Sequence, residues 1–295
     1  MLETKGSGTY ANGFPLTNST ASAATNGAYM VIKPGTHTLK IRYWVKDVVT
    51  NIEGTITKIL SSKNFEQNKY YNITANLDVK NYDGDHYYMW DAQEQYWKGY
   101  EWTKNLPAGT GQPTLNTSSS SNYAQNNTDP YNRWYHEGSG SPFNATQSCA
   151  GLPNVNEMTW YAAKGDPRWD GDELWTTMGH LCKGGMWFKK KASISEFNAN
   201  TAVDGTDWRT NGNGNTWSVS QTLPSAADAS NYFYLPALGH YDSGQLNNVG
   251  YFGFYWSSSA DPSNSDCACN MDFASGRVSV SNSYRYYGFR AEAFQ

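Results

Sequence analysis

The C-terminal stretch from Tyr255 to Phe294 alternates apolar and polar residues, which restricts it to a half-buried β-sheet. Met271 and Phe273 fall on one side, and after a turn at 275–276 Val278 and Val280 return to that side. The intervening positions hold a mixture of Asp, Cys, Asn, Ala, Arg, Ser and Tyr without a catalytic theme, which favours a binding surface. The predicted core framework is Tyr255, Trp256, Met271, Phe273, Val278, Val280, Gly288 and Phe289.

Composition narrows the class of protein. The chain has 295 residues, 16% of them charged and 15% aromatic, so its polarity comes mainly from Asn, Ser, Thr, Gly and Tyr. Adhesins and antibody-like binding surfaces use this chemistry, because Tyr offers a large contact area at little entropic cost. The net charge of -4 provides no attraction for nucleic acid or anionic lipid. We therefore expect no nucleic-acid partner and no membrane insertion, and we treat export signals as removed from this sequence.

The four cysteines do not make a disulfide framework at this length. Cys149 and Cys182 could form one bridge or remain as two buried thiols, and the sequence leaves both alternatives open. Cys267 and Cys269 are too close together for an easy mutual disulfide.

The pattern predicts an α+β protein of two domains. Residues 38–45, 54–60 and 70–79 read as strands of a partial, β-sandwich-like N-terminal module over 1–82. The second domain is expected over 83–295, with the Trp-rich stretch 90–102 packed on its core and a loop-like insertion at 105–147.

Further elements are predicted in the second domain. Asn154 and Glu157 form a capping box for a helix that ends at Gly165, with Val155, Met158 and Ala162 on its apolar side. A second short helix is predicted over 173–180, and strands over 184–191, 232–239 and 253–259.

The N-terminal strands, ending in Tyr70-Tyr-Asn-Ile-Thr-Ala-Asn-Leu-Asp-Val near Lys80, resemble the closing half of a fimbrillin domain. Fimbrillins are pilus subunits of Bacteroidales bacteria. The resemblance covers roughly residues 25–80 and implies attachment to other pilus subunits through this module. An unrelated β-sandwich remains the alternative.

Three landmarks of the second domain resemble the C-type-lectin fold in the variant shared with formylglycine-generating enzymes. They are the helix segment Leu152-Pro153 to Ala162, the strand Tyr255-Trp256-Ser-Ser-Ser, and Gly288-Phe289-Arg290. The resemblance implies a mixed antiparallel sheet with two short helices and long loops.

A narrower resemblance rests on Leu235-Pro-Ala-Leu-Gly and Leu246-Asn-Asn-Val-Gly, followed by Tyr255-Trp-Ser-Ser-Ser. These motifs are similar to those of surface proteins that diversity-generating retroelements rewrite, a group related in function to the phage major tropism determinant. Rewriting of asparagine codons never yields Lys, Glu, Gln, Met or Trp. The resemblance implies a variable region at about 240–292 whose ligand-binding positions, none of a forbidden type, are Phe252, Phe254, Asp261, Ser263, Asp266, Cys267, Cys269, Asn270, Asp272, Ala274, Arg277, Ser279, Ser281, Asn282, Ser283, Tyr284, Tyr286 and Tyr287. A lectin-like domain that is not diversified remains the alternative.

Enzymatic and metal chemistry find little support in the sequence. Formylglycine-generating enzymes use two cysteines spaced further apart than Cys267 and Cys269, so we expect no enzyme. The acidic turns 83–85 and 166–172 lack EF-hand spacing, the calcium-dependent sugar-binding loops are missing, and the histidines show no metal spacing. We expect no catalytic residue, metal or cofactor.

These expectations combine into a cell-surface adhesin on a pilus anchored in the outer membrane. Its aromatic anchors would contact an unidentified protein or glycan ligand on a host or bacterial surface, with Asp266, Asn270, Asp272 and Arg277 providing polar complementarity. A phage tail receptor-binding protein and a structural surface subunit without diversification are the alternatives.

Overall fold

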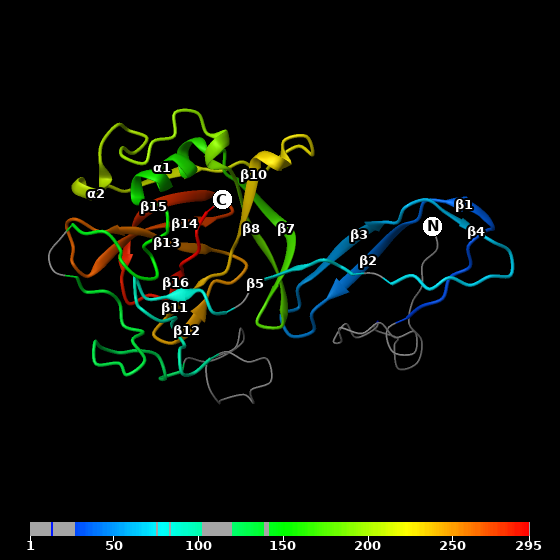
Figure 1. The fold of residues 1–295 in the computed structure, drawn as a ribbon, viewed down its shortest axis with the longest axis horizontal. Helices are drawn as coiled ribbons and strands as arrows, with labels where there is room; N and C mark the ends of the chain where they lie inside the picture. Colours follow the sequence, from blue (N-terminus) through cyan, green and yellow to red (C-terminus); the bar gives the residue numbers. More distant parts are fainter. Residues whose placement is uncertain are drawn as a thin grey trace. The chain divides into compact units, whose positions relative to one another are not determined.

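The computed structural model describes residues 13, 27–74, 76–82, 84–101, 120–138 and 142–294, and it is mostly β-sheet with few helices (Figure 1). Its contacts divide the chain into two compact units. The first comprises Met1–Val45 and Thr55–Asp78, and the second comprises Lys46–Gly54 and Val79–Gln295. The sequence placed the boundary at 82, whereas Lys80–Tyr82 forms a strand in a sheet of the second unit.

The first unit contains short strand pairs. β1 (Gly35–His37) pairs with β4 (Lys63–Phe65), and β2 (Lys40–Lys46) pairs with β3 (Glu53–Ile59). Side chains along β2 alternate in exposure as predicted, and Val45 is buried.

The strand predicted over 70–79 is wrong. The described residues there form no strand, and Ile73 is 38% exposed. Asp78 adopts a positive φ of 54°, which interrupts an extended chain and explains the failure.

The second unit is built on two larger sheets. The six-stranded sheet has the order β6 (Tyr87–Tyr88), β16 (Phe289–Arg290), β13 (Gly253–Ala260), β14 (Cys267–Ala274), β15 (Arg277–Tyr284) and β9 (Asn215–Ser218). The four-stranded sheet has the order β10 (Tyr232–Pro236), β8 (His180–Lys189), β7 (Arg168–Thr177) and β5 (Lys80–Tyr82). A further pair is β11 (His240–Asp242) with β12 (Gln245–Asn247). The strands predicted over 184–191, 232–239 and 253–259 are confirmed, since they overlap β8, β10 and β13.

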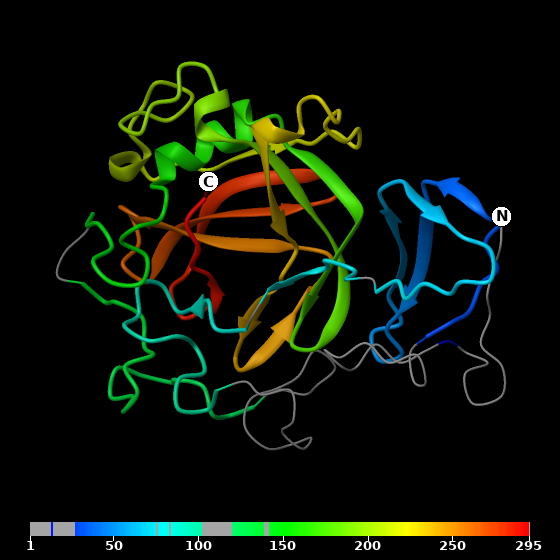
Figure 2. The same ribbon diagram turned by 45° about the vertical axis from the view of Figure 1, so that its right-hand side comes forward.

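Helix α1 (Val155–Lys164) covers one side of the six-stranded sheet. Its capping box is confirmed: the Asn154 side chain accepts from the Glu157 amide, and the Glu157 carboxylate accepts from the Asn154 amide. Figures 1 and 2 place α1 and α2 (Trp208–Asn211) on one side of β13, β14 and β15, and β11 and β12 on the other. Two single turns of 3-10 helix, Lys191–Ser193 and Ala229–Asn231, complete the helical content of the described residues.

The main core lies between α1 and the sheets. Met271, Phe273, Val278 and Val280 are fully buried there, which confirms the predicted framework. On the opposite side of the six-stranded sheet, Trp256 packs in a separate cluster whose members include Trp90, Cys149, Leu152 and Phe289. The predicted packing of the Trp-rich stretch is confirmed for Trp90 and Trp97, while Trp102 and residues 103–119 lie outside the described residues.

The helix predicted over 173–180 is wrong, because β7 and β8 form a hairpin there. Thr177 pairs with His180, and the two residues between them, Met178 and Gly179, have φ of 53° and 80°. Positive φ at both central positions is typical of the two-residue hairpin turn. The β-branched Thr176 and Thr177 favour a strand at this point.

No disulfide joins Cys149 and Cys182, which settles the alternative in favour of buried thiols. All four cysteines are free, and these two lie in different core clusters. Burial raises the pKa of each of the two thiols to about 12, so both are protonated at neutral pH.

Candidate ligand-binding face

Strand register sorts the C-terminal residues onto two sides of the six-stranded sheet. Phe254, Asp272, Ser279 and Thr216 lie in one cross-strand line, and the neighbouring line holds Trp256, Asn270 and Ser281. Directly opposed residues project to the same side of a sheet. The side away from α1 is called the outer face here, and it consists of Phe254, Trp256, Asn270, Asp272, Ala274, Arg277, Ser279, Ser281, Ser283 and Thr216.

The floor of the outer face is more buried than the sequence suggested. Asn270, Asp272 and Ser279 are 1%, 7% and 3% exposed, although they were predicted to point into solvent. Asp272 and Ser279 are buried because the long side chain of Arg277 lies next to them. Arg277 lies across both, with Nη1 2.7 Å from the Asp272 Oδ2 and hydrogen-bonded to the Ser279 Oγ.

Charge on this face is balanced locally. Burial raises the pKa of the Asp272 carboxyl, and the Arg277 guanidinium acts in the opposite direction. Thr216, which is exposed, extends the polar network from β9 with a hydrogen bond of 2.9 Å between its Oγ1 and the Ser279 Oγ. The outer face therefore offers hydrogen-bonding groups and a neutralised ion pair.

A continuous row of aromatic rings borders the outer face. Ring centroids are 5.9 Å apart for Phe252 and Phe254, 4.9 Å for Phe254 and Phe289, and 5.8 Å for Phe289 and Tyr287. The row continues to Tyr286 at 4.9 Å, and Tyr286 stacks on Tyr284 at 5.2 Å. The aromatic row is thus Phe252, Phe254, Phe289, Tyr287, Tyr286 and Tyr284; its last member, Tyr284, lies opposite Cys267 at the end of β15 and by register belongs to the α1 side.

The two ends of the aromatic row differ in exposure. Tyr284 and Tyr286 are 46% and 37% exposed, whereas Phe252, Phe254 and Tyr287 are half-buried and Phe289 is buried. Buried rings fix the row in place, and the exposed tyrosines supply accessible aromatic surface. Burial also raises the pKa of Tyr286 to about 12.

His240 packs against the middle of the aromatic row. Its ring centroid lies 4.4 Å from that of Phe254 and 5.8 Å from that of Tyr287. Among the described residues its Nδ1 has no hydrogen-bond partner, and burial lowers the pKa of the imidazole. No sequence signal indicates this role, since His240 belongs to the β11–β12 pair.

Cys267 and Cys269 are not displayed, which corrects the prediction for both. They are buried on the α1 side, where Cys269 joins the core with Met271, and burial raises the pKa of both thiols. The physical reason is the period of two: residues 267 and 269 share the side of 271 and 273.

The remaining predicted residues lie in the loop before β14 and on strands β14 and β15. Asp261 is 2% exposed rather than displayed, because its Oδ1 accepts from the backbone amides of Ser263 and Asn264 at 2.7 and 3.0 Å. Its Oδ2 accepts from the Asn282 side chain. Ser263, Asp266 and Asn282 are exposed, and Asn282, opposite Cys269, lies on the α1 side. Ala274, Ser281 and Ser283 belong to the outer face and are half-buried.

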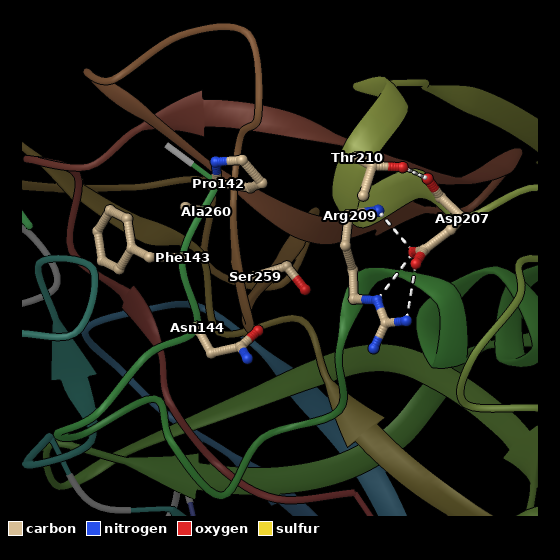
Figure 3. Close-up of a pocket in the computed structure, with 8 residues that line it drawn as sticks. All are labelled: Pro142, Phe143, Asn144, Asp207, Arg209, Thr210, Ser259 and Ala260. Carbon is tan, nitrogen blue, oxygen red and sulfur yellow. Dashed lines mark hydrogen bonds and ion pairs between the residues drawn. The ribbon is translucent and has the colours of Figure 1, made fainter. Parts of the chain in front are cut away.

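A separate pocket of about 240 Å³ lies between residues 142–144, α2 and the end of β13 (Figure 3). Its Arg209 guanidinium is hydrogen-bonded to Asp207, which lowers the pKa of that carboxyl to about 2. Phe143 directs its ring away from Arg209 and contacts the Trp90 ring edge to face, with centroids 5.3 Å apart. The pocket is lined by Pro142, Phe143, Asn144, Asp207, Arg209, Thr210, Ser259 and Ala260.

Within the described residues, no group of three His, Cys, Asp or Glu side chains is placed to hold a metal ion. In the same part of the chain, no helix has the length and apolar character needed to cross a bilayer. Comparisons with protein-family models, curated proteins and solved structures found no match to this chain.

Proposed function

We propose that the protein is a bacterial cell-surface adhesin whose C-terminal domain has a C-type-lectin fold and binds its ligand through the outer face and the aromatic row. The positions of the three sequence landmarks support the fold. The capped helix packs on the main core, Tyr255 and Trp256 occupy opposite sides of a central strand, and Phe289 and Arg290 form the short strand beside it.

One observation carries the proposal: half-exposed aromatic rings and a polar sheet face adjoin without a break. Phe254 belongs to both, because it lies opposite Asp272 in the sheet and next to Phe252 and Phe289 in the row. Tyr and Arg are enriched among the residues that dominate binding energy. A rigid sheet keeps such side chains in place before a ligand arrives, which reduces the entropic cost of association.

We further propose that a diversity-generating retroelement varies this surface and that the fimbrillin-like first unit attaches the protein to a pilus. Exposed substitutions away from the core usually cost little stability, so the exposed Tyr284 and Tyr286 can change at much less cost than a core residue. Cys269 has no such freedom, because it lies in the core.

The DNA beside the gene tests the diversification. A reverse-transcriptase gene and an imperfect repeat of the 3′ end that differs only at adenines are expected. Intact flanking DNA without either would contradict this part of the proposal and leave ligand binding to be tested separately.

Adhesion of beads that carry the full chain tests the binding role. A panel of host-cell and bacterial-cell surfaces is compared for wild type, Tyr286→Ala, and the matched control Tyr131→Ala, whose side chain has a similar exposure of 38%. We expect Tyr286→Ala to abolish adhesion and Tyr131→Ala to retain it. Equal adhesion by all three proteins would contradict the proposal.

A further inference from the structure

Asn270 is an unusual residue at the centre of the outer face. It is 1% exposed, yet neither its side-chain oxygen nor its side-chain nitrogen has a hydrogen-bond partner among the described residues. Buried polar groups without partners are rare in folded proteins, and each requires an explanation. A small apolar residue would fill this position in the sheet without that penalty.

The surroundings of Asn270 indicate where a partner can approach. In the cross-strand line, the fully buried Trp256 closes the side toward β13. Ser281 stands on the other side, on β15, and it is short and half-buried. The carboxamide is covered in the free chain, and Ser281 is the shorter and more exposed of its two neighbours in this line.

We propose that Asn270 recognises a main-chain peptide group of a polypeptide ligand, an inference that rests on the proposed function of the outer face. A carboxamide carries one acceptor and one donor group in a plane. It thus matches the C=O and N–H of a peptide group, with which it forms two hydrogen bonds. Approach across Ser281 brings an extended segment of the ligand over the face.

The rest of the outer face fits the same class of ligand. Asp272 is already paired with Arg277, so the floor presents no unpaired charge to attract an ionic ligand. Phe252 and Phe254 lie side by side and offer apolar surface for the side chains of a polypeptide. Recognition through a main-chain group also tolerates different ligand sequences, because every residue carries a peptide bond.

The test uses the full chain and a displayed library of random linear peptides, with a glycan array in parallel. A selected peptide is resynthesised with each backbone amide N-methylated in turn, which removes one donor at a time. Affinities are measured for wild type, Asn270→Leu, Ser281→Leu and Asn215→Leu. Asn215 is the matched control, because it is exposed and belongs to the other side of the sheet.

We expect Asn270→Leu to raise the melting temperature by about 2–4 °C and to weaken peptide binding about tenfold. N-methylation at one position is expected to weaken binding to wild type to a similar degree and to have no further effect on Asn270→Leu. Ser281→Leu, which blocks the approach, weakens binding without the gain in melting temperature, and Asn215→Leu changes neither quantity.

Equal peptide affinity of wild type and Asn270→Leu would overturn the inference, as would indifference to N-methylation at every position. If Asn270→Leu fails to fold, the N-methylated peptides and Ser281→Leu still decide the question. If ligands are found only on the glycan array and Tyr286→Ala abolishes their binding, the polypeptide assignment is overturned but the adhesin proposal stands. A ligand whose affinity is unchanged by Tyr286→Ala would contradict the adhesin proposal itself.

Discussion

Replacement of Tyr284 by Ala should cost much less stability than replacement of a core residue of the same sheet. Tyr284 is 46% exposed, so about half of its side chain is buried, which corresponds to about 1 kcal/mol of hydrophobic stabilisation. Loss of its stacking on Tyr286, at a centroid distance of 5.2 Å, adds about 0.5 kcal/mol. The expected total is about 1–2 kcal/mol.

Phe273→Ala is the comparison. Phe273 is fully buried and lies between the rings of Tyr255 and Phe188, at 5.8 and 5.9 Å. Truncation of such a residue leaves a cavity and costs about 3–5 kcal/mol. The structure therefore predicts a difference of about 2–3 kcal/mol in the free energy of unfolding between the two variants.

Urea denaturation followed by tryptophan fluorescence measures this difference. All tryptophans except Trp44 belong to the second unit, so the signal reports mainly on the unit that contains both substitutions. If Tyr284→Ala loses as much stability as Phe273→Ala, Tyr284 is part of the core, and the aromatic row cannot serve as a replaceable binding surface.

Three further predictions concern the polar and buried groups of the second unit. Arg277→Ala removes the ion-pair partner of the Asp272 carboxyl and should cost about 1–3 kcal/mol in urea denaturation, most of it recovered by adding Asp272→Asn; no recovery would show that the pair is not the cause. Burial lowers the pKa of His240 below its ordinary value of 6.5, so the unfolded chain gains the proton first and stability falls as the pH drops below 6.5; melting curves of His240→Phe should show a smaller fall, and an unchanged pH profile would contradict this. Iodoacetamide should label no cysteine rapidly in the native protein and all four after denaturation, because all four thiols are buried. Rapid labelling of Cys267 or Cys269 in the native protein would show that these thiols are exposed.

The sheet of the C-terminal stretch could be predicted because its alternation is locally complete. Met271, Phe273, Val278 and Val280 specify both strands, their inner side and the turn between them. The same alternation, continued backward, places Cys269 and Cys267 on the core side. The signal is present, but the resemblance to diversified proteins placed both cysteines among the variable positions.

The depth of a residue on the outer face could not be predicted from the period of two. Alternation assigns Asp272 and Ser279 to a side, but their burial depends on how Arg277 lies across them. Thr216 and His240 reach the site from β9 and β11, and only the tertiary fold brings these strands to it.

Elements with mixed signals were predicted least well. The 173–180 segment contains helix-compatible residues, yet its Met178-Gly179 turn converts it into a hairpin. The 70–79 segment has strand composition but is interrupted at Asp78. Helix α1, in contrast, is specified by its own cap and apolar positions, so its start at Val155 could be predicted closely.

Hydroxyl-radical footprinting of the full chain, free and bound to cells that it adheres to, tests the binding surface most directly. We expect protection of Tyr284 and Tyr286, with Tyr131 and Tyr70 oxidised to the same extent in both states, although all four are exposed in the free chain. Unchanged oxidation of Tyr284 and Tyr286 in the bound state, with protection elsewhere, would contradict the account.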